Sequence, residues 1–342
     1  MKKIYILIAL LAAVILVYLI ASSKTPQRYR KSADLMYTTV SVTVVAGDRE
    51  TAEEAIDAAF KSISALERSL SSWTNTSEIG RINELAGKMP VKVSVRTFEI
   101  ASLALEIAQN TSGAFDPTVG PLMRLWDYRK AKIPSREEVS RVLKRVGFRK
   151  ITFDLDGQSV FLSKPDMYFD TGGIAKGYAV DRAVEVLKEH GISSGLVTIA
   201  GDMRAFGTRE DGEPWKVGIR DPRGESEEDI IATLELRDEA VSTSGDYERF
   251  FIKDGKRYHH IIDPATGYPA EGTMSFSVIA PRAVLTDGYS TGAFVLGPQK
   301  GIETLEEVGL EGLAISSDGK TYATEELSNR IKWVSDRYRH GM

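Results

Sequence analysis

The segment Phe169–Ala179 has the sequence FDTGGIAKGYA, which sets a carboxylate, two glycines and a lysine close together. Its pattern predicts a strand that ends at Asp170, a turn at Gly172-Gly173 and a helix with Lys176 near its start. Glycines let a backbone approach a ligand closely, and a helix N-terminus attracts phosphate. A tight turn explains the glycines equally well, but it leaves Lys176 unexplained, because the helix dipole disfavours a cation there.

Strand and helix patterns alternate on both sides of this segment. Helices are predicted at 51–66, opened by a capping box from Thr51 to Glu54, at Val95–Asn110 and at Arg136–Val146. Strands are predicted at Met36–Val45, Leu196–Ile199, Trp215–Ile219, Ile230–Leu236 and Ser275–Ile279, with a strand pair at 150–161 that turns at Asp156-Gly157. Strand–glycine–helix units are predicted at Tyr168–His190 and Leu285–Leu296. Because several strands are joined by hairpin-like turns, we expect a mixed α/β (α+β) fold with substantial antiparallel sheet, in one compact catalytic unit at 35–338.

The N-terminal residues 1–24 predict a membrane anchor or a signal segment. Lys2 and Lys3 precede an unbroken apolar run, Ile4–Ala21. A membrane span needs roughly 17–25 residues and a signal core about 7–15, so the run favours an uncleaved anchor over cleavage near Ser23. The lysines favour the cytoplasmic side, so we expect anchoring in the inner (cytoplasmic) membrane with the catalytic domain extracytoplasmic or periplasmic. The polar and basic residues 25–34 are expected to be a tether.

The bulk composition narrows the classes of function. The chain has 342 residues, a net charge of −4 and no cysteine. Without cysteine, disulfides, thiolate catalysis, zinc fingers and iron–sulfur clusters are excluded. Basic residues are not gathered into a patch, so no nucleic-acid partner is expected, because such binding rests on neutralising many phosphates.

The segment Thr286–Gly292 (TDGYSTG) carries oxygen-bearing side chains at helical spacing. Asp287, Ser290 and Thr291 stand at i, i+3 and i+4, so they become neighbours on a helix that begins here. Oxygen ligands without histidine or cysteine suit Mg²⁺ or Ca²⁺ far better than zinc. The alternative is structural, because Asp287 is also a good N-cap for a helix through the apolar residues that follow.

The segment His259–Pro269 (HHIIDPATGYP) holds adjacent histidines at the end of a predicted strand. Alternation along the strand sends His259 and His260 to opposite faces, so at most one of them readily faces a site. The residues after them have ordinary turn chemistry and need no function. A catalytic histidine and a structural one both remain open here.

Aromatic residues mark two further segments. In SGAFDPTVGPLMRLW, Phe115 and Trp126 can stack on a planar ring or pack in the core. Trp73 lies in the polar stretch SSWTNTSEI and has less core to join, which favours a ligand contact. The polar turns at Gly201-Asp202 and Thr243–Tyr247 are weak signals when taken alone.

Taken together and in order, these segments resemble the ApbE family of FAD:protein FMN transferases. The resemblance runs from Trp73 to Gly297, and the strand at Met36–Val45 is similar to the family's opening strand. It therefore covers nearly the whole chain after the N-terminal segment. The collinear motifs that carry it are SSWTNTSEIGRIN, GAFDPTVGPLMRLW, FDTGGIAKGYAVDRA, IAGDMRAFG with PWKVGIRDP, STSGDYERFF with HHIIDPATGYPA, and TDGYSTGAFVLG.

The resemblance implies FAD as the substrate and Mg²⁺ as the metal, with Ca²⁺ left open by the residues themselves. Members of the family move the FMN half of FAD onto a threonine or serine hydroxyl of a partner protein and release AMP. The resemblance implies Asp287 and Thr291 as metal ligands, completed by the backbone at Gly173 and Ser290. The implied partner is an acceptor protein, expected to be a subunit of a membrane redox complex.

The resemblance also implies roles in catalysis and in FAD binding. His260 matches the histidine of the family's HxxDP motif and is a candidate general base. Lys176 would add positive charge beside the pyrophosphate, alongside the metal at Asp287. The implied FAD contacts are Met36, Trp73, Ala114, Phe115, Asp116, Asp170, Lys176 and Ile261.

The chain departs from the family pattern at positions that are not proposed side-chain ligands. Thr171 stands where leucine is usual, and Gly288 and Gly292 stand where alanine is common. We therefore expect activity to survive. Two alternatives keep the resemblance but change the function, namely an FAD pyrophosphatase that gives FMN and AMP, and a non-catalytic FAD-binding protein.

Overall fold

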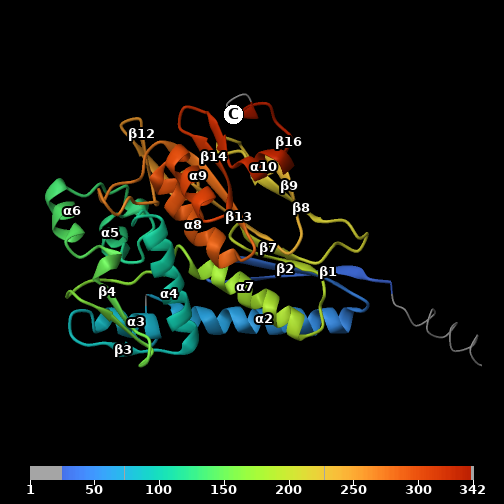
Figure 1. The fold of residues 1–342 in the computed structure, drawn as a ribbon, viewed down its shortest axis with the longest axis horizontal. Helices are drawn as coiled ribbons and strands as arrows, with labels where there is room; N and C mark the ends of the chain where they lie inside the picture. Colours follow the sequence, from blue (N-terminus) through green and yellow to red (C-terminus); the bar gives the residue numbers. More distant parts are fainter. Residues whose placement is uncertain (1–24, 73, 227, 340–342) are drawn as a thin grey trace, which may run out of the picture.

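The computed structural model describes residues 25–72, 74–226 and 228–339. Its main feature is an eight-stranded sheet with the order β1-β2-β6-β7-β10-β13-β14-β15, in which neighbouring strands are antiparallel (Figure 1). The predicted mixed fold with a large antiparallel sheet is confirmed. The strands are β1 (Gln27–Leu35), β2 (Thr38–Ala46), β6 (Gly195–Ile199), β7 (Asp202–Phe206), β10 (Ala240–Gly245), β13 (Thr273–Ala280), β14 (Glu311–Ser316) and β15 (Thr321–Ala323).

A layer of helices packs against one face of this sheet, where the largest core cluster lies (Figure 1). α2 forms because its apolar residues recur at helical spacing, and that stripe is buried against α7 and the β1–β2 hairpin. α7 in turn packs on α8, and α8 lies over β10 and β13. The helices of this layer are α2 (Arg49–Leu70), α7 (Ala175–Glu189), α8 (Ala283–Leu296) and α9 (Pro298–Glu307).

The other face of the sheet is covered by a second, three-stranded sheet with the order β16-β9-β8. Its apolar residues share a core with side chains of β10, β13 and β14, such as Val241, Ile279 and Leu313. Because β13 is covered on both sides, every residue in it is buried. The elements of this layer are β8 (Trp215–Arg220), β9 (Ile230–Leu236), β16 (Lys332–Trp333) and α10 (Glu325–Arg330).

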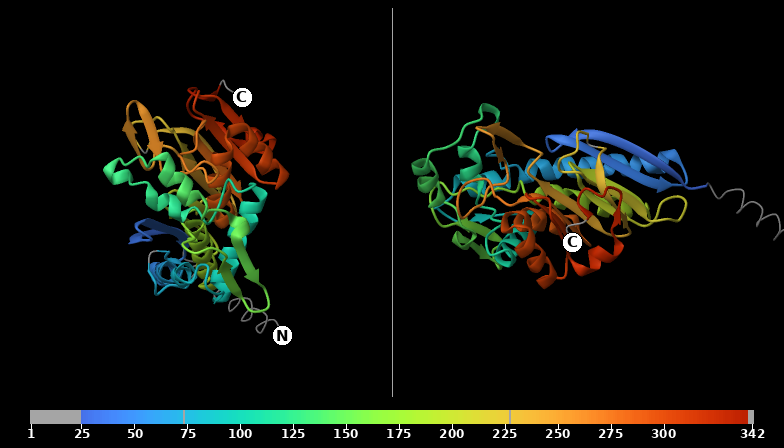
Figure 2. Two further views of the ribbon diagram at one scale, coloured as in Figure 1. Left: turned by 90° about the vertical axis from the view of Figure 1, so that its left-hand side faces the viewer. Right: turned by 90° about the horizontal axis from the view of Figure 1, so that it is seen from above.

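A third group of elements lies at one end of the molecule (Figures 1 and 2). Here the hairpin of β11 (Phe250–Lys253) and β12 (Lys256–His259) packs on α5 through Trp126, Phe251 and Tyr258. The remaining elements are α3 (Glu78–Glu84), β3 (Val91–Lys92), α4 (Val95–Asn110), α5 (Gly120–Leu125), η1 (Tyr128–Lys130), α6 (Arg136–Leu143), η2 (Phe148–Lys150), β4 (Ile151–Asp154) and β5 (Ser159–Leu162).

The structure corrects the expected tether at 25–34. Residues Gln27–Leu35 form β1, which pairs along its full length with β2 through a turn at Met36 and Tyr37. Both turn residues have positive φ, 52° and 60°, as the tight hairpin turn requires. β1 escaped prediction because it is an edge strand, where charged side chains are favoured and little is buried.

Two helix starts were predicted wrongly. The capping box from Thr51 to Glu54 is absent, because α2 begins at Arg49 and its N-cap is Asp48, which accepts the N–H of Thr51 at 2.9 Å. The strand–glycine–helix unit at Leu285–Leu296 is wrong as well, since α8 begins at Ala283 directly after β13.

The helix of the other unit, Tyr168–His190, is confirmed as α7, but Tyr168–Asp170 lies outside any strand. The remaining predicted strands are confirmed within one to two residues at their ends. The predicted N-terminal segment 1–24 lies outside the described residues. Among the helices that are described, none is both long and apolar enough to cross a membrane.

Candidate functional site

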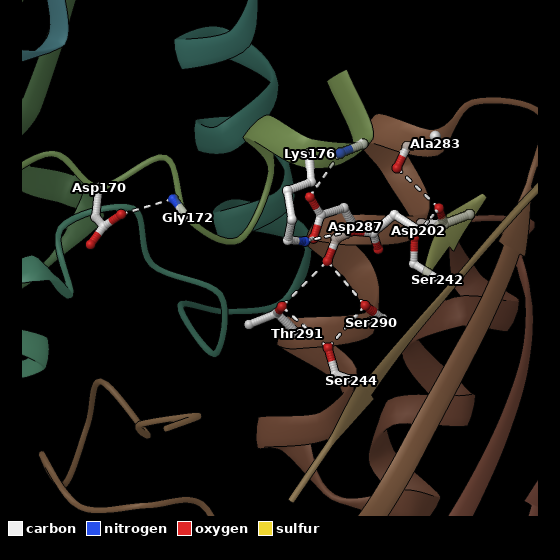
Figure 3. Close-up of polar contacts among 12 residues, drawn as sticks. Asp170, Gly172, Lys176, Asp202, Ser242, Ser244, Ala283, Asp287, Ser290 and Thr291 are labelled. Carbon is white, nitrogen blue, oxygen red and sulfur yellow. Dashed lines mark hydrogen bonds and ion pairs between the residues drawn. The ribbon is translucent and has the colours of Figure 1, made fainter. Parts of the chain in front are cut away.

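A buried cluster of charges joins α7, β7 and α8. The ammonium of Lys176, at the start of α7, pairs with the carboxylate of Asp202 at the start of β7, and lies 3.1 Å from Oδ1 of Asp287 on α8 (Figure 3). Only 4% of Asp202 and 3% of Asp287 is exposed to solvent. The lysine that the helix dipole left unexplained is therefore held by two buried carboxylates.

The cluster carries one positive charge for two negative charges. Burial alone would lower the pKa of Lys176, but the charges of Asp202 and Asp287 raise it above its ordinary value. Burial raises the pKa of Asp287, and the nearby charge of Asp202 raises it further. The two carboxylates together favour the charged form of Lys176, and Asp202 disfavours the charged form of Asp287, because one ammonium faces two carboxylates. The cluster is thus short of one positive charge.

The carboxylate of Asp287 closes the first turn of α7 and does not cap its own helix. Its Oδ2 accepts the backbone N–H of Gly177 at 2.9 Å. Asp287 lies in the second turn of α8, so the N-cap alternative is wrong. Gly177 allows the contact because a Cβ there would lie 2.1 Å from the carbonyl oxygen of Ala283 and 2.8 Å from Cβ of Asp287.

A group of hydroxyls lies one turn further along α8. The hydroxyls of Ser290 and Thr291 donate to the backbone oxygen of Asp287 at 3.0 and 3.3 Å. Oγ of Ser244, on β10, lies 3.0 Å from Oγ of Ser290 and 3.4 Å from Oγ1 of Thr291 (Figure 3). Side-chain and backbone oxygens of α8 are therefore gathered beside Ser244 of β10.

Gly173 lies beside this hydroxyl group. A Cβ at Gly173 would lie 3.6 Å from Oγ1 of Thr291 and 3.1 Å from the ring of Phe115. The fold thus brings together Gly173, Asp287, Ser290 and Thr291, which were predicted as metal ligands. Within the described residues, no group of three or more His, Cys, Asp or Glu side chains is placed to hold a metal ion. The predicted set has a single carboxylate, and its other oxygens belong to hydroxyl groups and to the backbone.

The predicted FAD contacts near the glycine turn are held by local hydrogen bonds. Oδ1 of Asp170 accepts the N–H of Gly172 at 2.8 Å (Figure 3). Asp116 is buried, and its carboxylate accepts the N–H and hydroxyl of Thr118 at 2.8 and 2.6 Å and the N–H of Phe148 at 2.8 Å. The carboxylate of Asp116 is therefore committed to the fold, while that of Asp170 makes one backbone contact.

The other predicted FAD contacts are placed less closely together. Met36 lies in the turn between β1 and β2 and packs against the main core. Phe115 and Ile261 are buried in that core, and Ala114 is half-buried beside Phe115. Trp73 lies outside the described residues.

The two histidines have different environments, and His260 lies just after the end of β12. His259 is buried, with Nε2 2.8 Å from the backbone oxygen of Ala270 and its ring edge-on to Phe294. His260 is half-buried, and its Nδ1 is buried without a hydrogen-bond partner among the described atoms. Burial lowers the pKa of His260 to about 4, and the charges of Arg249 and Lys176 contribute. His260 is therefore neutral at neutral pH and has a free ring nitrogen.

Sequence reasoning missed several residues of this cluster. Asp202 and Ser244 were noted only as parts of polar turns, and Asp181 and Gly177 were not singled out. The available signal was the spacing of Asp202 and Arg204, because residues two apart on a strand share a face. Nothing local in the sequence marks Asp181 or Gly177, since their partners lie on α8.

Known proteins match most of this chain in sequence and in fold. The model of the ApbE family matches residues 36–314. The FAD:protein FMN transferase of Klebsiella pneumoniae is 33% identical over 97% of this chain and 95% of its own length, and that of Haemophilus influenzae is 33% identical over 96% and 97%. The solved ApbE protein of Thermotoga maritima is 35% identical with a TM-score of 0.83, over 89% of this chain and 99% of its own. The flavin transferase ApbE of Vibrio cholerae is 30% identical with a TM-score of 0.80, over the same shares.

Proposed function

Since the chain belongs to the ApbE family of flavin transferases, we propose that it transfers FMN from FAD to a threonine or serine hydroxyl of a partner protein, with Mg²⁺ as cofactor and AMP as the other product. The acceptor oxygen bonds to the phosphorus of the FMN half, and the bond from that phosphorus to the AMP oxygen breaks. The observation that carries the proposal is the buried cluster of Lys176, Asp202 and Asp287, which lacks one positive charge.

The residues around Asp287 fit a hard divalent cation. The donors are oxygens only, which suits Mg²⁺, and the uncompensated carboxylate is what a cation would neutralise. We assign the metal to the carboxylate of Asp287, the hydroxyl of Thr291 and the backbone oxygens of Gly173 and Ser290. When bound, Mg²⁺ would supply charge neutralisation for the pyrophosphate and for the departing AMP.

Lys176 would keep one carboxylate partner, Asp202, when Asp287 binds the metal. The ammonium then stays paired with Asp202, at the N-terminal end of α7. Ile174 at the N-cap offers no side-chain hydrogen bond. The N–H of Ala175 donates to the backbone oxygen of Thr171 and that of Gly177 to Asp287, so the N–H of Lys176 is the group of this first turn that we propose for an anion. Lys176 and the helix end together favour a phosphate group here.

His260 is proposed to accept the proton of the acceptor hydroxyl. A general base must be unprotonated and have a free lone pair, and the lowered pKa and unpartnered Nδ1 of His260 meet both needs. Bound phosphates would raise the pKa of His260 toward neutrality, because a negative charge favours the imidazolium.

The remaining residues are proposed to hold the flavin and adenine portions of FAD. The ring of Phe115 lies next to Gly173, and the half-buried carboxylate of Asp170 binds the N–H of Gly172, so both lie at the glycine turn that precedes α7. Met36, Trp73, Ala114, Asp116 and Ile261 complete the proposed set. Since the carboxylate of Asp116 is used by the fold, we expect its backbone to make the contact.

The test is to incubate the purified full chain with FAD and Mg²⁺, with and without candidate acceptor proteins. AMP release and the mass of the acceptor are followed together. AMP that depends on the acceptor, with a mass gain equal to an FMN phosphodiester, supports the transferase. AMP without an acceptor would identify a pyrophosphatase, and bound FAD without AMP would leave a flavin-binding protein.

We further propose that residues 1–24 anchor the chain in the inner membrane, with the catalytic domain on the periplasmic side and a redox-complex subunit as acceptor. The support is the lysine-flanked apolar run Ile4–Ala21. Protease added to spheroplasts should degrade the catalytic domain. Protection until the membrane is opened would place the domain on the cytoplasmic side.

A further inference from the structure

Asp181 stands on α7 and binds the start of α8. It is buried, and its Oδ1 accepts the N–H of Ala283 at 2.8 Å while its Oδ2 accepts the N–H of Val284 at 3.0 Å. The N-cap position of α8 is Arg282, which offers no side-chain cap. The first turn of α8 is therefore capped by a carboxylate from the neighbouring helix.

Arg204 on β7 holds the same carboxylate. Its Nη1 lies 2.7 Å from Oδ1 of Asp181, and both side chains are largely buried. Arg204 is two residues from Asp202, so the two side chains leave β7 on one face. β7 thus binds α7 through two ion pairs of opposite polarity, Asp202 with Lys176 and Arg204 with Asp181.

These contacts fix how far α8 is shifted along α7. Asp181 holds the start of α8, and Asp287 in its second turn meets Gly177 and Lys176 at the start of α7. A carboxylate accepts both N–H groups of α8, whereas an amide has only one accepting oxygen and presents a donor to the other N–H. The position of Asp287 therefore depends on the charge and symmetry of the group at 181.

We propose that Asp181, clamped by Arg204, is a positioning residue that sets the divalent-metal affinity of the site on α8. The inference rests on the proposed function, because it assumes the metal at Asp287. Partners that orient a metal ligand commonly change affinity by about 10–100-fold when they are replaced. Asp181→Asn should therefore raise the Kd for Mg²⁺ about tenfold or more.

The experiment measures Mg²⁺ binding alone by titration calorimetry on the full chain, with thermal unfolding in parallel. Asp221→Asn is the matched control. Asp221 is also buried, accepts a backbone N–H from Arg223 at 2.8 Å and pairs with Arg337 at 3.1 Å, but it lies after β8, on the far side of the main sheet. Both variants should lose stability, and only Asp181→Asn should lose Mg²⁺ affinity.

A double variant keeps the test possible if Asp181→Asn does not fold. Asp181→Asn leaves Arg204 buried without its partner, which is strongly destabilising, whereas Asp181→Asn with Arg204→Met removes both charges. The double variant should regain stability and still bind Mg²⁺ more weakly than the wild type. If the folded variants kept the wild-type Mg²⁺ affinity, the role of Asp181 would be overturned and the metal assignment would stand. A wild-type chain that bound no Mg²⁺ would overturn the metal assignment and this inference with it.

Discussion

Asp287 Oδ2 accepts the backbone N–H of Gly177 at 2.9 Å, so the carboxylate assigned to the metal also closes the first turn of the helix that carries Lys176. The carboxylate of Asp287 thus both caps α7 and belongs to the proposed metal site. A substitution at 287 has two effects, one on charge and one on the helix cap, and side chains that differ only in charge can separate them.

Asp287→Asn should strongly lower FMN transfer and cost less stability than Asp287→Ala. The amide oxygen can still accept the N–H of Gly177, but the negative charge for the metal is lost, so the rate should fall about a hundredfold or more. Asp287→Ala should lose the rate and also about 0.5–2 kcal/mol of stability with the cap. Transfer is measured by acceptor mass, and stability by denaturant unfolding. Transfer by Asp287→Asn at the wild-type rate would contradict the metal assignment.

Lys176→Met should destabilise the chain and make it more dependent on Mg²⁺. Two buried carboxylates, Asp202 and Asp287, would lose the one cation that pairs with them among the described residues, and removing a buried partner costs about 3 kcal/mol. Mg²⁺ should then raise the unfolding temperature of the variant more than that of the wild type, because the metal replaces the missing charge.

Lys188→Met is the matched control for that experiment. Lys188 lies on the same helix, is exposed, and is 4.0 Å from Asp238. Exposed pairs contribute little, so its response to Mg²⁺ should equal that of the wild type. An equal Mg²⁺ response in Lys176→Met would show that the cluster is not short of positive charge.

The sequence predicted several strands, such as β2, β6, β9 and β13, and the site segments because their signals are local. β9 matched its prediction at both ends, Ile230 and Leu236, since alternation and β-branched residues fix a strand without reference to its neighbours. The spacing of Asp287, Ser290 and Thr291 gave one helix face, which the structure confirms.

The capping residues of α7 and α8 could not be predicted, because each helix is capped from the other. Ile174 and Arg282 occupy the N-cap positions, and neither side chain makes a cap. The caps come from Asp287 and Asp181, each more than a hundred residues away in sequence. Rules that look for a capping residue just before a helix therefore placed Asp287 at the wrong position.

Asp116 and Asp170 were both predicted as FAD contacts, and the structure separates their expected effects. Asp116→Ala should destabilise the chain by about 1–3 kcal/mol for each buried N–H left without an acceptor, at Thr118 and Phe148. Asp170→Ala releases only the N–H of Gly172, so its stability should fall less and its FAD affinity more. Denaturant unfolding and flavin fluorescence measure the two effects. A larger stability loss in Asp170→Ala would contradict this assignment.

His260 should make the stability of the chain fall in mild acid. Its pKa in the folded chain is lowered to about 4, chiefly by burial and then by the charge of Arg249, whereas an unfolded histidine titrates near ~6.5. Between these values the unfolded chain binds more protons, so the free energy of unfolding decreases as pH falls from about 6.5 to about 4. In His260→Gln the free energy of unfolding should therefore fall less in acid. Part of the fall should remain, because burial also lowers the pKa of His259.

The same substitution tests the proposed base. His260→Gln should lower FMN transfer by about 10²–10⁴-fold while FAD binding is kept, because loss of a general base acts on the chemical step. His190→Gln is the control, since His190 is exposed at the end of α7. Denaturant midpoints at pH 7.5 and pH 5 and the transfer rate are measured for each variant. If His260→Gln keeps the wild-type acid sensitivity but loses transfer, His260 acts on the reaction and its pKa in the folded chain is not lowered. If it loses neither, the proton acceptor must be another group.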